Sequence, residues 1–199
     1  MERNREERRG KIFVISGPSG SGKTTLRDAL LKDRLVRKLF VKSVSFTTRK
    51  KRTGEKNGKD YCFITEREFK GLLKAKKILE WTKYLGYYYA TSKPFVDDKL
   101  GSGKNIILCL DLKGASRIKK IYPKSSVTVF ILPPSISELR RRIEGRCAQT
   151  KAAEVKKRLG LAQKELASAP EFNYRVVNSK LGQASRELKN IIIKETVQG

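Results

Sequence analysis

Short apolar segments alternate along the chain with longer segments that have helical spacing. The apolar runs have the length of buried strands and lie at residues 11–16, 41–46, 105–110, 126–132 and 174–177. The helical segments between and after them lie at residues 24–39, 114–122, 135–143, 152–168 and 181–193. Parallel strands need connections long enough to hold a helix, so the alternation predicts an α/β fold with a parallel sheet covered on both faces.

Residues 47–103 break this alternation. Turn residues occur at 53–54 and 57–58, and a helix-like stretch occupies residues 66–74. Aromatic residues suited to short strands or pockets accompany them: Tyr61, Phe63, Tyr84, Tyr88 and Tyr89. The segment is interpreted as a small mixed insertion on the sheet, and we expect substrate recognition there.

The length of 199 residues suits a single domain, which commonly has about 100–200 residues. We expect residues 1–10, which are highly charged, to form a flexible tail and residues 11–199 to form one domain. The absence of His excludes a Ser-His-Asp triad and a His-ligated metal. Three separated cysteines favour a reducing compartment, and no run reaches the about 20 apolar residues of a membrane span, so we expect a cytoplasmic protein without a membrane segment.

A phosphate-binding motif directly follows the first predicted strand. The pattern G-x-x-x-x-G-K-[ST] is satisfied by Gly17, Pro18, Ser19, Gly20, Ser21, Gly22, Lys23 and Thr24. Such a loop points backbone N–H groups at phosphate oxygens, and the helix that follows adds its partial positive charge. Lys23 is expected at the β- and γ-phosphates of a nucleotide and Thr24 in a Mg²⁺ shell. The alternative is a glycine-rich turn that binds nothing.

A second candidate anion site follows the second predicted strand. Arg49 and Arg52 stand three residues apart, with Tyr61 downstream. Two guanidinium groups and a phenol could hold one phosphate monoester through charge-assisted hydrogen bonds. A solvated basic loop is the alternative in a chain this basic.

The ordered motifs of the chain resemble those of the guanylate kinase family. The run S-x-T-T-R-x-x-R-x-G-E-x-N-G-x-D-Y begins at Ser45, after G-P-S-G-x-G-K-T. The similarity covers residues 11–195 and continues at residues 78–81, 88–89, 110–114, 132–135 and 142–146. It implies a P-loop NTPase-like three-layer fold, with a mixed α+β GMP-binding insertion at 47–103 and a helical lid at about 138–160. It also implies transfer of the γ-phosphoryl group of ATP to GMP, and to dGMP, with Mg²⁺.

The resemblance also assigns roles to individual residues. The GMP phosphate would be held by Arg49, Arg52, Tyr61 and Tyr89, with Glu55 in the same site. The guanine would be read by Ser45, Glu80, Thr91 and Asp111. Besides the phosphate loop, Thr25 and Asn178 would lie at ATP. The catalytic cations would be Lys23, Arg49, Arg142, Arg146 and Arg158.

The chemistry of guanine supports the role of Glu80. Guanine offers N1–H and N2–H₂ as adjacent donors, so one carboxylate accepts both, whereas adenine has an acceptor at N1. A site that loses a buried hydrogen-bond partner rejects the wrong base strongly. Taken alone, Glu80 could be an ordinary surface acid before a packed Trp81.

Several positions leave alternatives open. Asp111 ends an apolar run, where P-loop proteins place an acid that supports Mg²⁺, whereas the family directs it toward GMP. Cys109 stands on the same strand face, where the family has a second acid, so Asp111 either covers both tasks or metal positioning is weaker. Ala90 and Cys147 replace glycines of the family pattern, and the pair at 178–179 departs from Asn-Asp.

The net charge of +26 exceeds what two anionic substrates require. It is either a lysine-rich solvated surface or a binding surface for RNA or another polyanion. Two other functions compete with a kinase of GMP: a catalytically silent interaction module and a kinase of a phosphorylated ribose. The intact phosphate loop argues against the first, and the complete base-reading pattern argues against the second. The oligomeric state does not follow from the sequence.

Overall fold

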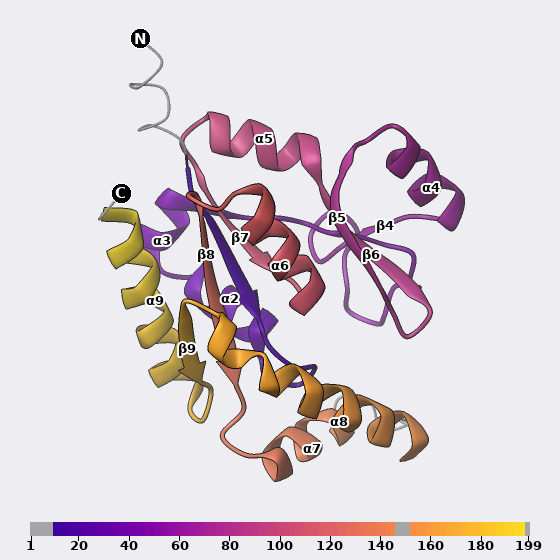
Figure 1. Cartoon of the computed structure of the whole chain (residues 1–199), viewed down its shortest axis with the longest axis vertical. Helices are drawn as coiled ribbons and strands as arrows, with labels where there is room; N and C mark the ends of the chain where they lie inside the picture. Colours follow the sequence, from indigo (N-terminus) through magenta and orange to yellow (C-terminus); the bar gives the residue numbers. More distant parts are fainter. Residues whose placement is uncertain (1–9, 146–151, 198–199) are drawn as a thin grey trace.

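A five-stranded parallel sheet forms the centre of the molecule (Figure 1). The structure is a computed structural model that describes residues 10–145 and 152–197. The strand order is β2-β7-β1-β8-β9. The strands are β1 (Ile12–Ser16), β2 (Phe40–Lys42), β7 (Asn105–Cys109), β8 (Ser126–Leu132) and β9 (Tyr174–Val177). All neighbouring pairs run parallel, which confirms the predicted sheet.

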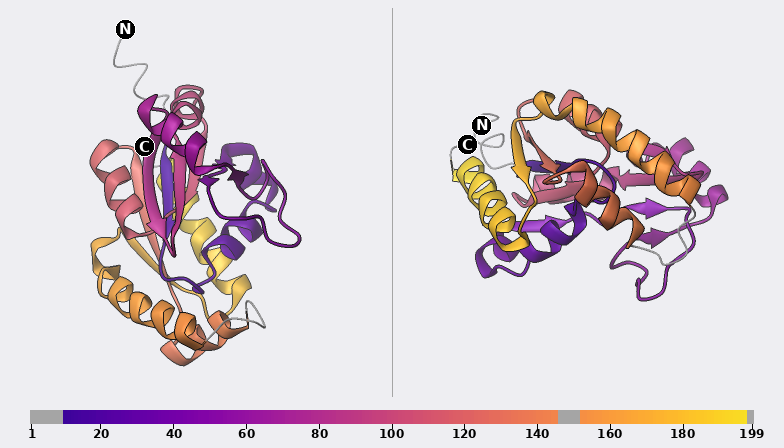
Figure 2. Two further views of the ribbon diagram at one scale, coloured as in Figure 1. Left: turned by 90° about the vertical axis from the view of Figure 1, so that its right-hand side faces the viewer. Right: turned by 90° about the horizontal axis from the view of Figure 1, so that it is seen from below.

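Helices cover both faces of this sheet (Figure 2). Successive side chains of a strand point to opposite faces. Phe13 and Ile15 therefore join a core that includes Leu26 and Leu188, whereas Ile12 and Val14 join a core that includes Ile118. The covering helices are α2 (Lys23–Leu30), α3 (Arg34–Leu39) and α9 (Leu181–Val197) on one face, and α5 (Lys93–Gly101) and α6 (Leu112–Ile121) on the other. The three-layer α/β architecture is confirmed.

A second, mixed sheet lies beside the first and has the strand order β4-β3-β6-β5 (Figure 1). Its strands are β3 (Phe46–Thr47), β4 (Cys62–Phe63), β5 (Ile78–Tyr84) and β6 (Tyr87–Ser92). Helix α4 (Glu66–Lys74) begins with a capping box between Thr65 and Glu68. The segment 47–103 also contains α5, whose Val96 and Leu100 pack into the core of the parallel sheet.

Two predicted elements are each split in the structure. The strand expected at 41–46 is wrong as one unit, because β2 pairs with β7 of the parallel sheet and β3 pairs with β4 and β6 of the mixed sheet. The helix expected at 24–39 ends at Leu30, and α3 starts after Asp33. The Asp33 carboxylate accepts the N–H groups of Leu35 and Val36, so it caps a new helix.

Helices α7 (Ile136–Glu144) and α8 (Ala152–Ala167) overlap residues 138–160, for which a lid is predicted (Figure 1). They share a small apolar core of Leu139, Ile143, Val155 and Ala162. Arg146 and Cys147 lie outside the described residues, as do residues 1–9 of the expected tail. Gly10, the last residue of that tail, is buried, and its N–H donates to the carbonyl of Leu100. A short 3₁₀ turn, η1 (Ala169–Glu171), leads from α8 to β9.

Candidate active site

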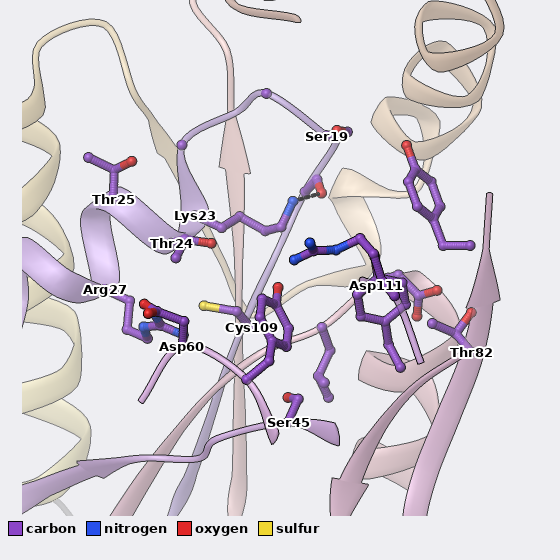
Figure 3. Close-up of a pocket in the computed structure, with 18 of the residues that line it drawn as sticks. Ser19, Lys23, Thr24, Thr25, Arg27, Ser45, Asp60, Thr82, Cys109 and Asp111 are labelled. Atoms are coloured by element: carbon purple, nitrogen blue, oxygen red, sulfur yellow. Dashed lines mark hydrogen bonds between the residues drawn. The ribbon is translucent and has the colours of Figure 1, made fainter. Parts of the chain in front are cut away.

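The start of α2, the mixed sheet, the end of β7 and α8 all line one cavity of about 1150 Å³ (Figure 3). Strands β1 and β7 end here beside the start of α2. In open parallel sheets, ligands bind in a crevice outside the carboxyl ends of the strands. This volume accommodates more than one small ligand.

The phosphate loop lies at one end of the cavity and has the shape that its sequence predicts. Gly17 has a φ of +135°, and a Cβ on it would lie 2.4 Å from the carbonyl oxygen of Ile131, so glycine is required there. The Lys23 ammonium donates to the carbonyls of Gly17 at 2.5 Å and Pro18 at 3.0 Å. Six loop residues and the adjacent Thr25 line the cavity: Gly17, Ser19, Gly20, Gly22, Lys23, Thr24 and Thr25.

Pro18 and Ser21 belong to the loop but do not line the cavity, and neither does the predicted ATP residue Asn178. Pro18 and Ser21 are buried, and the Ser21 N–H donates to the Pro18 carbonyl. The Asn178 amide donates to the Ser21 carbonyl at 2.8 Å. Asn178 therefore fixes the shape of the loop.

A cationic cluster from the mixed sheet and its loops also lines the cavity. The two terminal nitrogens of Arg49 donate to the two carboxylate oxygens of Glu55 at 3.1 and 2.8 Å. Glu55 also accepts the backbone N–H of Arg52, and these bonds outweigh burial and hold the pKa of Glu55 below its usual range. The Arg49 guanidinium lies over the ring of Tyr61, 5.5 Å from its centroid. Arg49, Arg52, Glu55, Tyr61 and Tyr89 all line the cavity.

Glu80 is a buried carboxyl on the wall of the same cavity. Only 3% of the residue is exposed, and its Oε1 accepts the hydroxyl of Thr91 at 2.5 Å. Burial raises the pKa of Glu80 to about 7, the Thr91 hydrogen bond opposes this, and the nearby Asp111 carboxylate adds to it. Thr91 is itself buried and contacts the site through Glu80.

Asp111 and Ser45 also line the cavity. Asp111 caps α6, since its Oδ1 accepts the Gly114 N–H at 2.8 Å. Glycine at 114 lets the first turn of α6 approach Glu80, because a Cβ there would lie 2.8 Å from Glu80 Oε2. The capping bond leaves Asp111 Oδ2 for a base or a metal.

The residues at the phosphate loop match the preferences of Mg²⁺. Mg²⁺ keeps several waters and takes one or two protein oxygens together with phosphate oxygens. The Thr24 hydroxyl and the Asp111 carboxylate are oxygen donors of this kind on the cavity wall. Within the described part of the chain, no three His, Cys, Asp or Glu side chains group as an all-protein metal site.

The lid residues fall into two groups. Arg158 lines the cavity. Arg142 does not line it, because its guanidinium donates to Glu138 at 2.8 Å and to the Asn178 carbonyl at 3.0 Å. The predicted Arg146 lies outside the described residues.

Sequence reasoning missed several residues in or next to the cavity, among them Arg27, Lys157 and Gly114. Arg27 lines the cavity from α2, and Lys157 lines it from α8. Gly114 contacts Glu80, as described above. Arg27 follows Lys23 by four positions, so a shared helix face was the signal that could have identified it.

A phosphate loop that shares one cavity with a second cationic site defines a P-loop phosphotransferase with a phosphorylated acceptor. The family model described as Guanylate kinase matches residues 9–195. The chain therefore belongs to the guanylate kinase family, as its motifs predicted.

Individual relatives agree over almost the full chain. A guanylate kinase of Wolbachia pipientis wMel is 40% identical over 95% of this chain and 92% of its own length. A guanylate kinase of Synechocystis is 41% identical over 94% of this chain and 95% of its own length. The crystal structure of guanylate kinase from Anaplasma phagocytophilum covers 94% of this chain and 87% of its own, with 31% identity and a TM-score of 0.78. Of the helices described, none has the length and apolar character needed to cross a membrane.

Proposed function

We infer that the protein transfers the γ-phosphoryl group of ATP to GMP and so forms ADP and GDP. This activity follows from membership of the guanylate kinase family. The observation that supports this activity for this chain is that the phosphate loop with Lys23 lines the same cavity as Arg49 and Glu80. We extend the proposal to dGMP as acceptor, because the named contacts involve base and phosphate only.

The donor nucleotide binds at the phosphate loop. Backbone N–H groups of the loop and the N-terminus of α2 surround the phosphates, and Lys23 moves from the Gly17 and Pro18 carbonyls to phosphate oxygens. When bound with ATP, Mg²⁺ neutralises charge on the β- and γ-phosphates. Thr24 and Asp111 are the residues that would hold it. Asn178 acts indirectly, by holding the Ser21 carbonyl.

The acceptor binds at the opposite end of the cavity. Arg49 and Arg52 hold its phosphate with Tyr61 and Tyr89. Glu55 is a positioning residue that holds the Arg49 guanidinium and the backbone N–H of Arg52. Ionised Glu80 accepts N1–H and N2–H₂ of guanine. Thr91 orients Glu80, and Ser45 and Asp111 complete the base site.

Phosphoryl transfer then depends on alignment and positive charge. An attacking oxygen of the GMP phosphate bonds to the γ-phosphorus as the bond to the leaving ADP oxygen breaks. Lys23, Arg49 and Arg158 stabilise the charge on the transferring group. We propose that residues 138–160 form a lid on a single domain of residues 11–199, and that closure brings in Arg142 and Arg146 and expels water.

A coupled assay of ADP release tests the activity. Rates of ADP release by the unmodified protein, with ATP and Mg²⁺, are compared for the acceptors GMP, dGMP, AMP and UMP. We expect turnover with the two guanine nucleotides, and equal rates with AMP and GMP would reject the base site. Lys23→Ala should lower kcat by at least about 100-fold, because it removes a charge that faces the transferring group. Glu80→Ala should chiefly reduce selection of GMP over AMP.

The cellular setting is a further part of the proposal. Cys62 and Cys109 are free thiols, which supports a reducing compartment such as the cytoplasm.

A further inference from the structure

Arg27 is a cation of the cavity that the assignments above leave without a function. It lies on α2, one turn beyond Lys23, and its side chain is 9% exposed. Arginine side chains are rarely so deeply buried unless they are paired. Its partner Asp28 is 48% exposed, and one Asp28 oxygen, Oδ1, accepts from both Nε and Nη2 of Arg27.

Among the described residues, the surroundings of Arg27 supply one carboxylate partner, Asp28, and that partner is solvated. Cys109 lies within hydrogen-bonding reach of the guanidinium. Burial raises the pKa of the Cys109 thiol despite the nearby cations Arg27 and Lys23, so the thiol is neutral at physiological pH. A largely buried guanidinium with one solvated partner favours an anion in the cavity beside it.

The position of Arg27 points to the acceptor side of the cavity. Figure 3 shows Arg27 near Cys109 and Thr24, whereas the Lys23 side chain extends toward Ser19. Arg27 is also one of the charges that act on the Tyr61 phenol, together with Arg49. Tyr61 belongs to the proposed GMP phosphate site.

We propose that Arg27 is a third guanidinium for the acceptor phosphate, in addition to Arg49 and Arg52. The proposal rests on the function proposed above. It makes Arg27 a substrate-binding residue that reaches the phosphate from the helix of the donor site. Its charge lies between the two nucleotides and favours the approach of two anionic phosphates.

Binding of GMP and of guanosine to Arg27→Leu tests this assignment. Guanosine carries the same base without a phosphate, so it probes the base site alone. Isothermal titration calorimetry should show GMP affinity about tenfold or more below that of the unmodified protein, with guanosine affinity changed less than threefold. Arg27→Lys should recover part of the loss. Arg37→Leu removes an exposed arginine from the next helix, α3, and should change neither affinity.

Other results would overturn the assignment. An equal loss for GMP and guanosine would mean that Arg27 only supports the structure. A loss for ATP with unchanged GMP affinity would assign Arg27 to the donor. If Arg27→Leu does not fold, Arg27→Gln replaces it in the same comparison, with thermal unfolding as the check. The unmodified protein is assayed first for GMP-dependent ADP release. Absence of this activity would reject the proposed function, whereas activity with unchanged GMP affinity of Arg27→Leu would reject only the role of Arg27.

Discussion

At the scale of single residues, Glu80 links the burial of a carboxyl group to the choice of substrate. Its pKa is about 7, chiefly because the group is buried, and the Asp111 carboxylate raises the pKa further. A protonated carboxyl group presents an O–H donor where guanine also presents donors. Only the ionised form offers acceptors to both N1–H and N2–H₂ of the base. GMP binding and proton release from Glu80 are therefore coupled.

We expect kcat/KM for GMP to rise with pH up to about 7 and to level off above it. Below pH 7 the Glu80 carboxyl of the free protein is mostly protonated, because its pKa is raised to about 7. Each pH unit below this reduces the fraction of protein with ionised Glu80 by up to tenfold, so the rate falls with pH. Steady-state rates between pH 5.5 and 8.5 measure this dependence. Glu80→Gln, which does not titrate, should lose it.

Comparison with Glu80→Gln separates this effect from titration of the substrate. A phosphate monoester has its second pKa near about 6 and titrates in the same range with both proteins. Only the difference between the two profiles belongs to Glu80. Identical profiles would contradict the coupling.

At the scale of elements, the first turn of α6 determines how closely the helix approaches the base site. Gly114 donates its N–H to Asp111 and leaves space for Glu80 Oε2. The buried Glu80 has little room to move, because Thr91 holds its other oxygen. A methyl group at 114 must therefore displace the carboxylate or the helix.

Gly114→Ala should raise the KM for GMP about tenfold, because a displaced carboxylate loses hydrogen bonds to guanine. The KM for ATP should change less than threefold. Gly71→Ala is the matched control, since Gly71 lies within α4 and a Cβ there meets nothing within 4 Å. Both changes gain up to about 1 kcal/mol of helix propensity, so only the difference between them reports the clash. Unchanged kinetics of Gly114→Ala would contradict the role of this turn.

Elements whose pattern depends on burial could be predicted from the sequence, whereas elements set by a local polar bond could not. The strand Ser126–Leu132 was predicted at its observed limits because it is an apolar run in a covered sheet. The break at Asp33 was missed, because the apolar spacing continues across it and only the side-chain cap stops the helix. Arg27 was missed because a charged residue on a predicted helix suggests a solvated face. Glu80 and Thr91 were found from the motif, but their hydrogen bond depends on the pairing of β5 and β6.

At the scale of the whole molecule, the dominant feature is the net charge of +26. Basic residues are exposed on helices from all parts of the fold, such as Lys70 on α4, Lys119 on α6 and Lys157 on α8. Like charges repel and destabilise the compact state, and the same field attracts anionic substrates. Binding of RNA or another polyanion stays a prediction, because a field spread over all regions does not single out one partner surface.

Added salt should therefore stabilise this protein. The Debye length falls from about 30 Å at 0.01 M to about 10 Å at 0.1 M, so repulsion between distant charges is screened before attraction within close ion pairs. Exposed ion pairs such as Arg140–Glu144 are weakened as well, but each contributes little. We expect the Tm to rise between 10 and 200 mM NaCl in differential scanning fluorimetry. Sodium sulfate at equal ionic strength separates screening from anion binding. If the Tm rises more in sulfate than in NaCl, and Lys23→Ala reduces this difference, the additional rise is due to sulfate bound at the phosphate loop. A fall of the Tm with NaCl would mean that attractive pairs, and not the excess of like charge, dominate the electrostatic free energy of folding.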